Sequence, residues 1–252
     1  MLNLIKKNIA GIKIIFNNLE DISNCVINSE NQTILSTLSM PLLGELHENR
    51  DYFNALENSE IVLPDGMGIV LLSKIIHGKD SIKKRVTGPD FFLFFNEKAN
   101  KNKLKYFFLG STIETLEKIE NKIKAEYPDI IISGTLSPPF GNWDEKINNE
   151  ILKKINDANP DVLWVAMTAP KQEIWVYENR DRIKARIIAS IGAAFDFFAG
   201  TKRRAPEIFR RLGLEWLYRI FQEPFRMGKR YLKGFPYFIF YLFKGLKKRG
   251  EK

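Results

Sequence analysis

Short apolar runs alternate with longer amphipathic segments along this chain from about residue 32 onward. The runs are rich in β-branched and aromatic residues and are bounded by polar or glycine-containing stretches, a pattern typical of buried strands. We expect strands at Gln32–Leu38, Glu60–Leu63, Leu104–Leu109, Asp129–Ser133, Val162–Met167 and Arg186–Ile191. Because these runs have few polar positions, the pattern indicates a mostly parallel sheet that is covered on both faces.

Helix-length segments separate the expected strands. They span about Leu42–Ala55, Ile69–Ile76, Pro89–Asn100, Ile113–Tyr127, Asn142–Asn156 and Gln172–Arg182. For the first 30 residues we expect short strands and turns around the segment NNLEDISN. The alternation of strand and helix predicts an α/β fold with a Rossmann-like, mostly parallel sheet and helices on both faces.

Ligands of such sheets bind outside the carboxyl ends of the strands. Four loops follow expected strands directly and carry glycine, proline or small polar residues: Thr37–Pro41, Pro64–Gly68, Gly110–Thr112 and Met167–Gln172. We therefore expect the functional site to be built from these four loops.

Positive charge is concentrated at the end of the chain. Residues 201–252 hold 15 Lys and Arg against 4 Asp and Glu, a net charge of +11, whereas residues 1–200 hold 24 against 26, a net charge of −2. This asymmetry predicts an α/β core over residues 1–200 and a basic appendage over residues 201–252. It also indicates an anionic partner for the appendage, either a nucleic acid or an anionic membrane surface.

The appendage interleaves its basic residues with aromatic and aliphatic ones, which predicts amphipathic helices. Such helices are typical of a membrane interface, where Lys and Arg lie near lipid phosphates. Two alternatives remain open, a helix docked on the core and an RNA-binding arm. The longest apolar stretch, Phe235–Phe243, is too short to cross a bilayer, and the N-terminal segment lacks the pattern of a signal peptide.

Asp65 is the strongest catalytic candidate. It lies in a Pro-Asp-Gly turn at a strand end, where a carboxylate can accept a proton from a hydroxyl. An aspartate that only stabilises a turn or caps a helix is the simpler interpretation of the same position.

Two further loop residues could bind phosphate or sugar groups. Arg85 lies in the segment RVTGPD, and its guanidinium could pair with a diphosphate unless it is simply solvated. Gln172 follows a strand in the segment APKQE, where it and the free N–H groups of a helix start could bind a carbonyl, hydroxyl or phosphate.

Several kinds of chemistry lack sequence support. The chain has one cysteine, Cys25, and two histidines, His47 and His77, and it contains no Asp-x-Asp metal motif, no Walker loop and no Ser nucleophile elbow. We therefore expect no metal and no cofactor. Gly66-Met67-Gly68 is only a partial dinucleotide fingerprint, which argues against a dehydrogenase.

Six segments in order resemble the WecG/TagA/CpsF glycosyltransferases: VLPDGMGIV with RVTGPD, YFFLGS, SGTLSPPF, VAMTAPKQE, IGAAFDFFAGTKRRAP and LGLEWLYRIFQEP. The resemblance covers residues from about 35 to 233. It implies an inverting, metal-independent transfer of a hexose or N-acetylhexosamine from a UDP-sugar to a saccharide on polyprenol diphosphate, in the synthesis of cell-surface polysaccharides. It also implies a peripheral location on the cytoplasmic, inner face of the cell membrane.

The resemblance assigns roles to particular residues. Asp65 becomes the general base. The resemblance implies donor-binding roles for Thr37, Arg85 and Gln172, and we expect Ser39, Gly66, Gly110 and Asp196 to bind the donor with them. Residues that hold the acceptor diphosphate and the anionic membrane surface are Arg219, Arg226, Lys229 and Arg230. The expected partners are the donor, the lipid-linked acceptor and the membrane, without nucleic acid, and a homo-oligomer is compatible with the sequence.

The chain departs from the family pattern in two loops. The usual Thr-x-Asn is Thr37-Leu38-Ser39, and the usual Gly-Ala before PKQE is Thr168-Ala169. Since both loops are expected to line the donor sugar, a hexose such as glucose or galactose is an alternative to N-acetylmannosamine. The alternatives from other classes are a membrane-surface or RNA-binding module with a degenerate enzyme core, and a nucleotide-sugar hydrolase.

Overall fold

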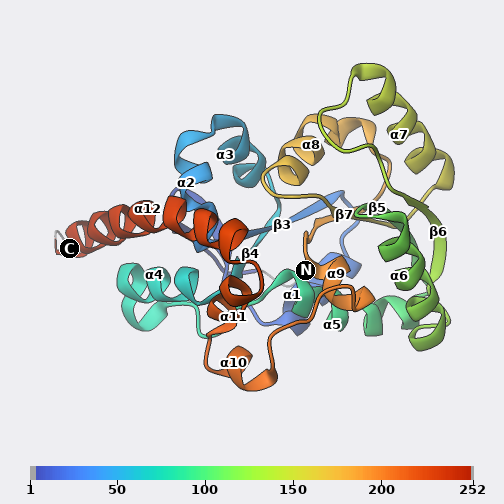
Figure 1. The fold of residues 1–252 in the computed structure, drawn as a ribbon. Coiled ribbons are helices and arrows are strands. Elements are labelled where there is room, and N and C mark those ends of the chain that lie inside the picture. Colours follow the sequence, from blue (N-terminus) through green and yellow to red (C-terminus); the bar gives the residue numbers. More distant parts are fainter. Residues whose placement is uncertain (1–3, 251–252) are drawn as a thin grey trace.

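A six-stranded parallel sheet forms the centre of the molecule (Figure 1). The computed structural model describes residues 4–250. The strands are β3 (Thr33–Ser39), β4 (Ile61–Asp65), β5 (Lys105–Gly110), β6 (Ile131–Leu136), β7 (Val162–Ala166) and β8 (Ile187–Ser190). Their order is β4-β3-β8-β7-β5-β6, and every neighbouring pair is parallel. The predicted α/β fold with a parallel sheet is confirmed.

The sheet is apolar on both faces, as the strand sequences predicted. Successive residues of β5 point to opposite sides, so Phe108 packs in one cluster with Trp164 of β7, while Phe107 packs in another with Leu163. Helices α1 (Leu19–Ile27), α5 (Gly88–Lys101), α6 (Ile113–Glu126) and α9 (Ala194–Ala199) cover the first face. Helices α7 (Glu145–Ala158) and α8 (Lys171–Asn179) cover the second.

A third apolar cluster forms beside β4, where the N-terminal hairpin and the end of the chain meet. The hairpin consists of the antiparallel strands β1 (Lys6–Ile9) and β2 (Ile12–Ile15). The helices around it are α2 (Leu43–Glu48), α3 (Arg50–Glu57) and α4 (Met67–His77). Single 3₁₀ turns lie before α2 at Met40–Leu42, after α4 at Gly78–Asp80 and after α8 at Arg180–Arg182. Phe238 and Tyr241 near the C-terminus are buried in the same cluster.

The appendage is helical, as expected, and it packs on the core. It comprises α10 (Glu207–Arg211), α11 (Glu215–Gln222) and the long α12 (Pro224–Gly250). Figure 1 shows α12 beside α4 and α2, with α11 next to the start of α12. Within residues 4–250, no helix is long and apolar enough to cross a membrane. The boundary at residue 200 between core and appendage stays a prediction.

Two expectations about local structure are wrong. The segment NNLEDISN forms most of helix α1 rather than turns, because the Asn18 side chain accepts a hydrogen bond from the Asp21 N–H and starts the helix. The helix expected over residues 42–55 is broken at Asn49, where the backbone is extended. The Asn49 side chain then accepts hydrogen bonds from the N–H groups of Asp51 and Tyr52 and so begins a new helix.

Candidate functional site

A polar cavity of about 610 Å³ opens at the carboxyl ends of the strands. It contains residues of all four loops that the sequence singled out, among them Thr37, Asp65, Gly110 and Gln172. Ser39 and Asp196 line it as well, so most of the expected donor-binding residues share one cavity. The loop of residues 138–143 forms another part of its wall.

Gly110 is required where β5 ends at this cavity. Its φ is +109°, and an added Cβ would lie 2.2 Å from the carbonyl oxygen of Ala166. The close approach brings β5 and β7 together, and Ser111 continues the turn with a φ of +60°. Helix α6 then begins with Thr112 as its N-cap, so its positive end lies beside the cavity.

Gln172 is fixed by hydrogen bonds at both ends of its amide. Its Oε1 accepts from the Met167 N–H at 3.1 Å, and its Nε2 donates to Glu173 at 2.7 Å. Glu173 is buried, and burial raises its pKa to about 7. The arrangement holds the loop after β7 in place at the cavity wall.

Basic side chains from the appendage and from α8 border the polar cavity: Lys171, Lys202, Arg219, Arg226 and Arg230. Lys202 pairs with Asp196 at 3.2 Å, and Arg226 pairs with Glu223. Burial and the neighbouring Arg226 and Arg219 lower the pKa of Arg230. Since these arginines repel one another, an anion in the cavity would be stabilised.

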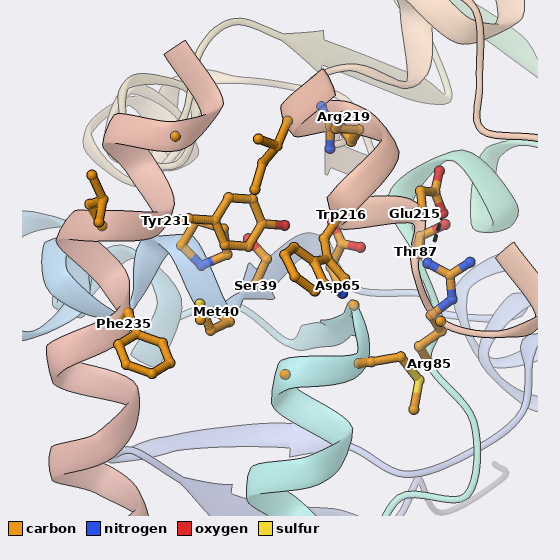
Figure 2. Close-up of a pocket in the computed structure, with 18 of the residues that line it drawn as sticks. Ser39, Met40, Asp65, Arg85, Thr87, Glu215, Trp216, Arg219, Tyr231 and Phe235 are labelled. Carbon is orange, nitrogen blue, oxygen red and sulfur yellow. Dashed lines mark hydrogen bonds and ion pairs between the residues drawn. The ribbon is translucent and has the colours of Figure 1, made fainter. Parts of the chain in front are cut away.

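A second cavity, of about 600 Å³ and mostly apolar, lies between the core and the appendage (Figure 2). Its apolar lining comes from three segments: Met40 and Pro41 after β3, Met67 at the start of α4, and Trp216, Ile220, Tyr231, Leu232, Phe235 and Pro236 of α11 and α12. Leu232 is 77% exposed and Phe235 is 53% exposed, so the rim of the cavity is apolar too.

Asp65 lies where the two cavities meet. Among residues 4–250, only Ser39, Asp65 and Arg219 border both of them. Burial raises the pKa of Asp65 to about 6, with Glu215 and Asp90 acting in the same direction and Arg219 and Arg85 opposing them. A carboxylate with this pKa is ionised near neutral pH and is basic enough to take a proton.

Three of the expected site residues do not line the polar cavity. Arg85 and Gly66 border the apolar cavity rather than the polar one, and Arg85 is already bound to Glu215 at 2.7 Å. Lys229 is exposed and lines neither cavity. Of the other basic residues expected to bind the acceptor, Arg219 borders both cavities, whereas Arg226 and Arg230 line only the polar one.

Sequence reasoning missed several residues around Asp65. Trp216 and Tyr231 line the apolar cavity near it, and Glu215 forms ion pairs with Arg85 and Arg204. Glu215 carried a usable signal, since it is one of 4 acidic residues in the basic appendage. Across the part of the chain that the structure describes, no group of three or more His, Cys, Asp or Glu side chains could hold a metal ion.

A parallel α/β sheet with a polar cavity at the carboxyl ends of its strands is the usual ligand-binding arrangement of open α/β enzymes. Comparison with known proteins identifies the family, because the model of the WecG/TagA/CpsF family of glycosyl transferases matches residues 7–252. The chain belongs to this family and is a glycosyltransferase.

Curated relatives cover most of the chain. An N-acetylglucosaminyldiphosphoundecaprenol N-acetyl-beta-D-mannosaminyltransferase of Bacillus subtilis (strain 168) is 32% identical over 77% of this chain and 73% of the relative. The protein of the same name from Staphylococcus aureus (strain MW2) is 28% identical over 87% of this chain and 83% of the relative.

Proposed function

We propose that this glycosyltransferase moves a hexose or N-acetylhexosamine, with inversion and without a metal, from a UDP-sugar to a saccharide on polyprenol diphosphate. Cell-surface polysaccharide synthesis is the process that this reaction would serve. One observation carries the proposal: Asp65 lies at the junction of a polar cavity and an apolar one. The two substrates would occupy the two cavities and meet at its carboxylate.

The polar cavity suits the donor. Its volume lies in the range of small-molecule sites, and its basic border provides partners for a diphosphate. Arg226 and Arg230, which the resemblance associates with the acceptor, would instead balance the charge of the UDP that leaves. A bound diphosphate would also relieve the repulsion that lowers the pKa of Arg230.

The apolar cavity suits the lipid-linked acceptor. Its exposed rim at Leu232 and Phe235 would contact the first isoprene units, while Arg219 at the junction would reach the diphosphate. The names of the relatives give N-acetylglucosaminyldiphosphoundecaprenol as their acceptor, and we propose the same chemical class here. The donor sugar is left as a hexose or N-acetylhexosamine because Ser39 departs from the family pattern in the cavity itself.

The reaction would be a single displacement. Asp65 takes the proton of the acceptor hydroxyl as that oxygen bonds to C1 of the donor sugar, and the bond from C1 to the diphosphate oxygen breaks. UDP leaves with the electron pair of that bond, and nearby arginines stabilise its charge in place of a metal. Attack from the face opposite the leaving group inverts C1.

We propose that the enzyme works at the inner face of the cell membrane, where its acceptor would lie, and that the appendage holds it there peripherally. Phe221, Phe225 and Phe243 are 73%, 93% and 64% exposed on a part of the chain that is strongly basic. Aromatic side chains in the interface and cations near lipid phosphates would act together.

A transfer assay tests the proposal. The full chain is incubated with a panel of UDP-sugars and a synthetic short-chain lipid-diphosphate acceptor, and the product is analysed by mass spectrometry and by the anomeric NMR coupling. Transfer of one hexose or N-acetylhexosamine with an inverted anomer, undiminished by EDTA, is the expected result. Retention of the anomer, or loss of transfer in EDTA, would contradict the mechanism.

A further inference from the structure

A largely buried cluster of four charged side chains joins the appendage to the core, and Figure 2 shows two of them, Arg85 and Glu215, beside Asp65. The side chain of Glu215 is only 10% exposed, and it accepts from Arg85 Nη1 at 2.7 Å and from Arg204 Nε at 3.3 Å. Arg204 Nη2 also donates to Asp90 Oδ1 at 2.6 Å. Two guanidinium groups and two carboxylates therefore form one neutral network.

The cluster is anchored in the backbone on both sides. On the core side, the Thr87 hydroxyl donates to the Asp90 carboxylate at 2.7 Å. It also accepts a hydrogen bond from the Asp90 N–H in the first turn of α5. On the appendage side, Arg85 Nη2 donates to the carbonyl oxygen of Arg210 at 3.2 Å. The segment that precedes α5, the N-terminus of α5 and the connection from α10 to α11 are thus held to one another.

The position of Glu215 gives the cluster a role in the site. Glu215 is the first residue of α11, the next residue is Trp216 of the apolar cavity, and Arg219 follows one turn later at the junction of both cavities. A shift at the start of α11 would move both side chains relative to Asp65.

We propose that Glu215 is a positioning residue, held by Arg85 and Arg204, whose ion pairs set α11 over Asp65 so that Trp216 and Arg219 face the substrates. The inference rests on the proposed function in taking Asp65 as the base. It replaces the donor contact expected for Arg85 with a role through Glu215.

Simple adhesion of the appendage would not need this network. Buried ion pairs cost desolvation energy, and apolar side chains of similar size often stabilise a fold as well or better. What a guanidinium adds, when its fork of N–H donors binds two acceptors at once as in Arg85 and Arg204, is a fixed orientation. Active sites are sensitive to that orientation, since a displacement of about 1 Å can cost ~10²-fold in rate.

The cluster also acts on Asp65 through its charge. Glu215 and Asp90 raise the pKa of Asp65, whereas Arg219 and Arg85 lower it, and Tyr52 and Tyr231 are the other titratable groups near it. Removing the charge of Glu215 would therefore lower the pKa of Asp65. A residue that served stability alone would change the melting temperature without moving the pH dependence of the reaction.

The test compares Glu215→Gln with Glu207→Gln in the full-length enzyme. Glu207 is a matched control because it belongs to the same appendage and pairs with Arg211 at an exposed position. For Glu215→Gln we expect kcat to fall by about 10- to 100-fold, with the acid limb of the pH profile moved to lower pH. Glu207→Gln should retain wild-type kinetics, and Glu215→Asp should recover part of the lost rate.

Arg85→Lys separates orientation from charge and provides a milder variant if Glu215→Gln does not fold. It keeps one ion pair with Glu215 but loses the fork, so kcat should fall while the acid limb and the affinity for UDP stay unchanged. A fall in UDP affinity would make Arg85 a donor ligand and would overturn the inference, as would wild-type kcat in Glu215→Gln. Failure of Asp65 as the base would instead be seen as undiminished turnover in Asp65→Asn.

Discussion

Asp65 derives its chemistry from the turn in which it lies. Gly66, with a φ of +89°, lets the chain leave β4 and begin α4 at Met67. No atom lies within 4 Å of the position that a Cβ of Gly66 would occupy, so the backbone conformation rather than space requires glycine here. The abrupt turn leaves the Asp65 carboxylate at the end of the strand, open to both cavities.

Replacing Asp65 by Asn should abolish most of the activity and preserve the fold. The amide keeps the shape of the side chain but cannot accept the proton, and loss of a general base costs on the order of 10²–10⁴-fold. Initial rates of sugar transfer measure the effect. Asp80→Asn, at a carboxylate that is 82% exposed in a pair with Lys7, is the matched control, and a rate for Asp65→Asn within about threefold of wild type would exclude Asp65 as the base.

The activity should rise with pH through the pKa of Asp65. The active form is the carboxylate, so we expect the acid limb of kcat/KM to have its midpoint near pH 6, where the pKa of this group lies. A pH profile of initial rates measures it. A rate that does not change between about pH 5 and 8 would be incompatible with this assignment.

Stability should change with pH in the opposite direction. Folding raises the pKa of Asp65 from 3.8 to about 6. The contribution of Asp65 to the free energy of unfolding is therefore most favourable below pH 3.8 and is lost as the pH rises through about 6. Asp65→Asn should therefore melt at a higher temperature than wild type near pH 8, with little difference near pH 4. Equal shifts at both pH values would show that the carboxylate is not destabilised in the fold.

The sequence predicted those site residues that strand ends determine. Thr37, Gly110 and Gln172 follow apolar runs, so their convergence in one cavity follows from the parallel sheet. The partner of Arg85 could not be predicted in the same way. Glu215 lies 130 residues further along the chain, and only the docking of the appendage brings the two charges together.

At the scale of elements, hydrophobic patterning located every strand of the sheet, because each is an apolar run between polar segments. The pattern could not distinguish one amphipathic helix from two, and Asn49 divides α2 from α3 through its side-chain hydrogen bonds. The pattern also could not predict the strand order, because β3 pairs with β8, which lies far along the chain.

Gly234→Leu should displace α12 from the core. An added Cβ would lie 2.6 Å from the carbonyl oxygen of Met40 and 2.7 Å from the Cα of Pro41, and overpacking of this kind costs about 1–3 kcal/mol. We expect faster amide exchange in α12, unchanged protection in β7 and reduced transfer. Hydrogen exchange by mass spectrometry reads all segments at once, with Lys244→Gln on the same helix as the control, and unaltered exchange in α12 would show that the helix is not held by this contact.

At the scale of the whole molecule, charge and exposed aromatic residues coincide in the appendage. The body of residues 1–200 has a net charge of −2 and the appendage has +11, so nearly all of the excess positive charge lies on the appendage. The same appendage supplies much of the wall of the apolar cavity. The same helices would then serve both membrane attachment and acceptor binding.

Phe225→Glu should release the enzyme from anionic vesicles. Phe225 is 93% exposed, and a carboxylate in its place would oppose both insertion and attraction to lipid phosphates. Ile113→Glu is the matched control, because Ile113 is 66% exposed on α6 of the core. Sedimentation with phosphatidylglycerol vesicles should fall several-fold only for Phe225→Glu. Binding of the wild type should weaken with added salt, because exposed charges are screened beyond a Debye length of ~8 Å at physiological ionic strength. Equal sedimentation of both variants would place the membrane contact elsewhere.

The central place of β8 determines when this chain can finish folding during synthesis. β3 ends at Ser39, but its neighbour β8 begins only at Ile187, and β8 is also the strand that connects β3 and β4 with β7, β5 and β6. A ribosome needs on the order of ten seconds to make the intervening segment. Throughout that time, the edge of β3 that will face β8 has no partner in the sheet. The growing chain therefore exposes unpaired backbone N–H and C=O groups that chaperones must shield or that other nascent chains can pair with.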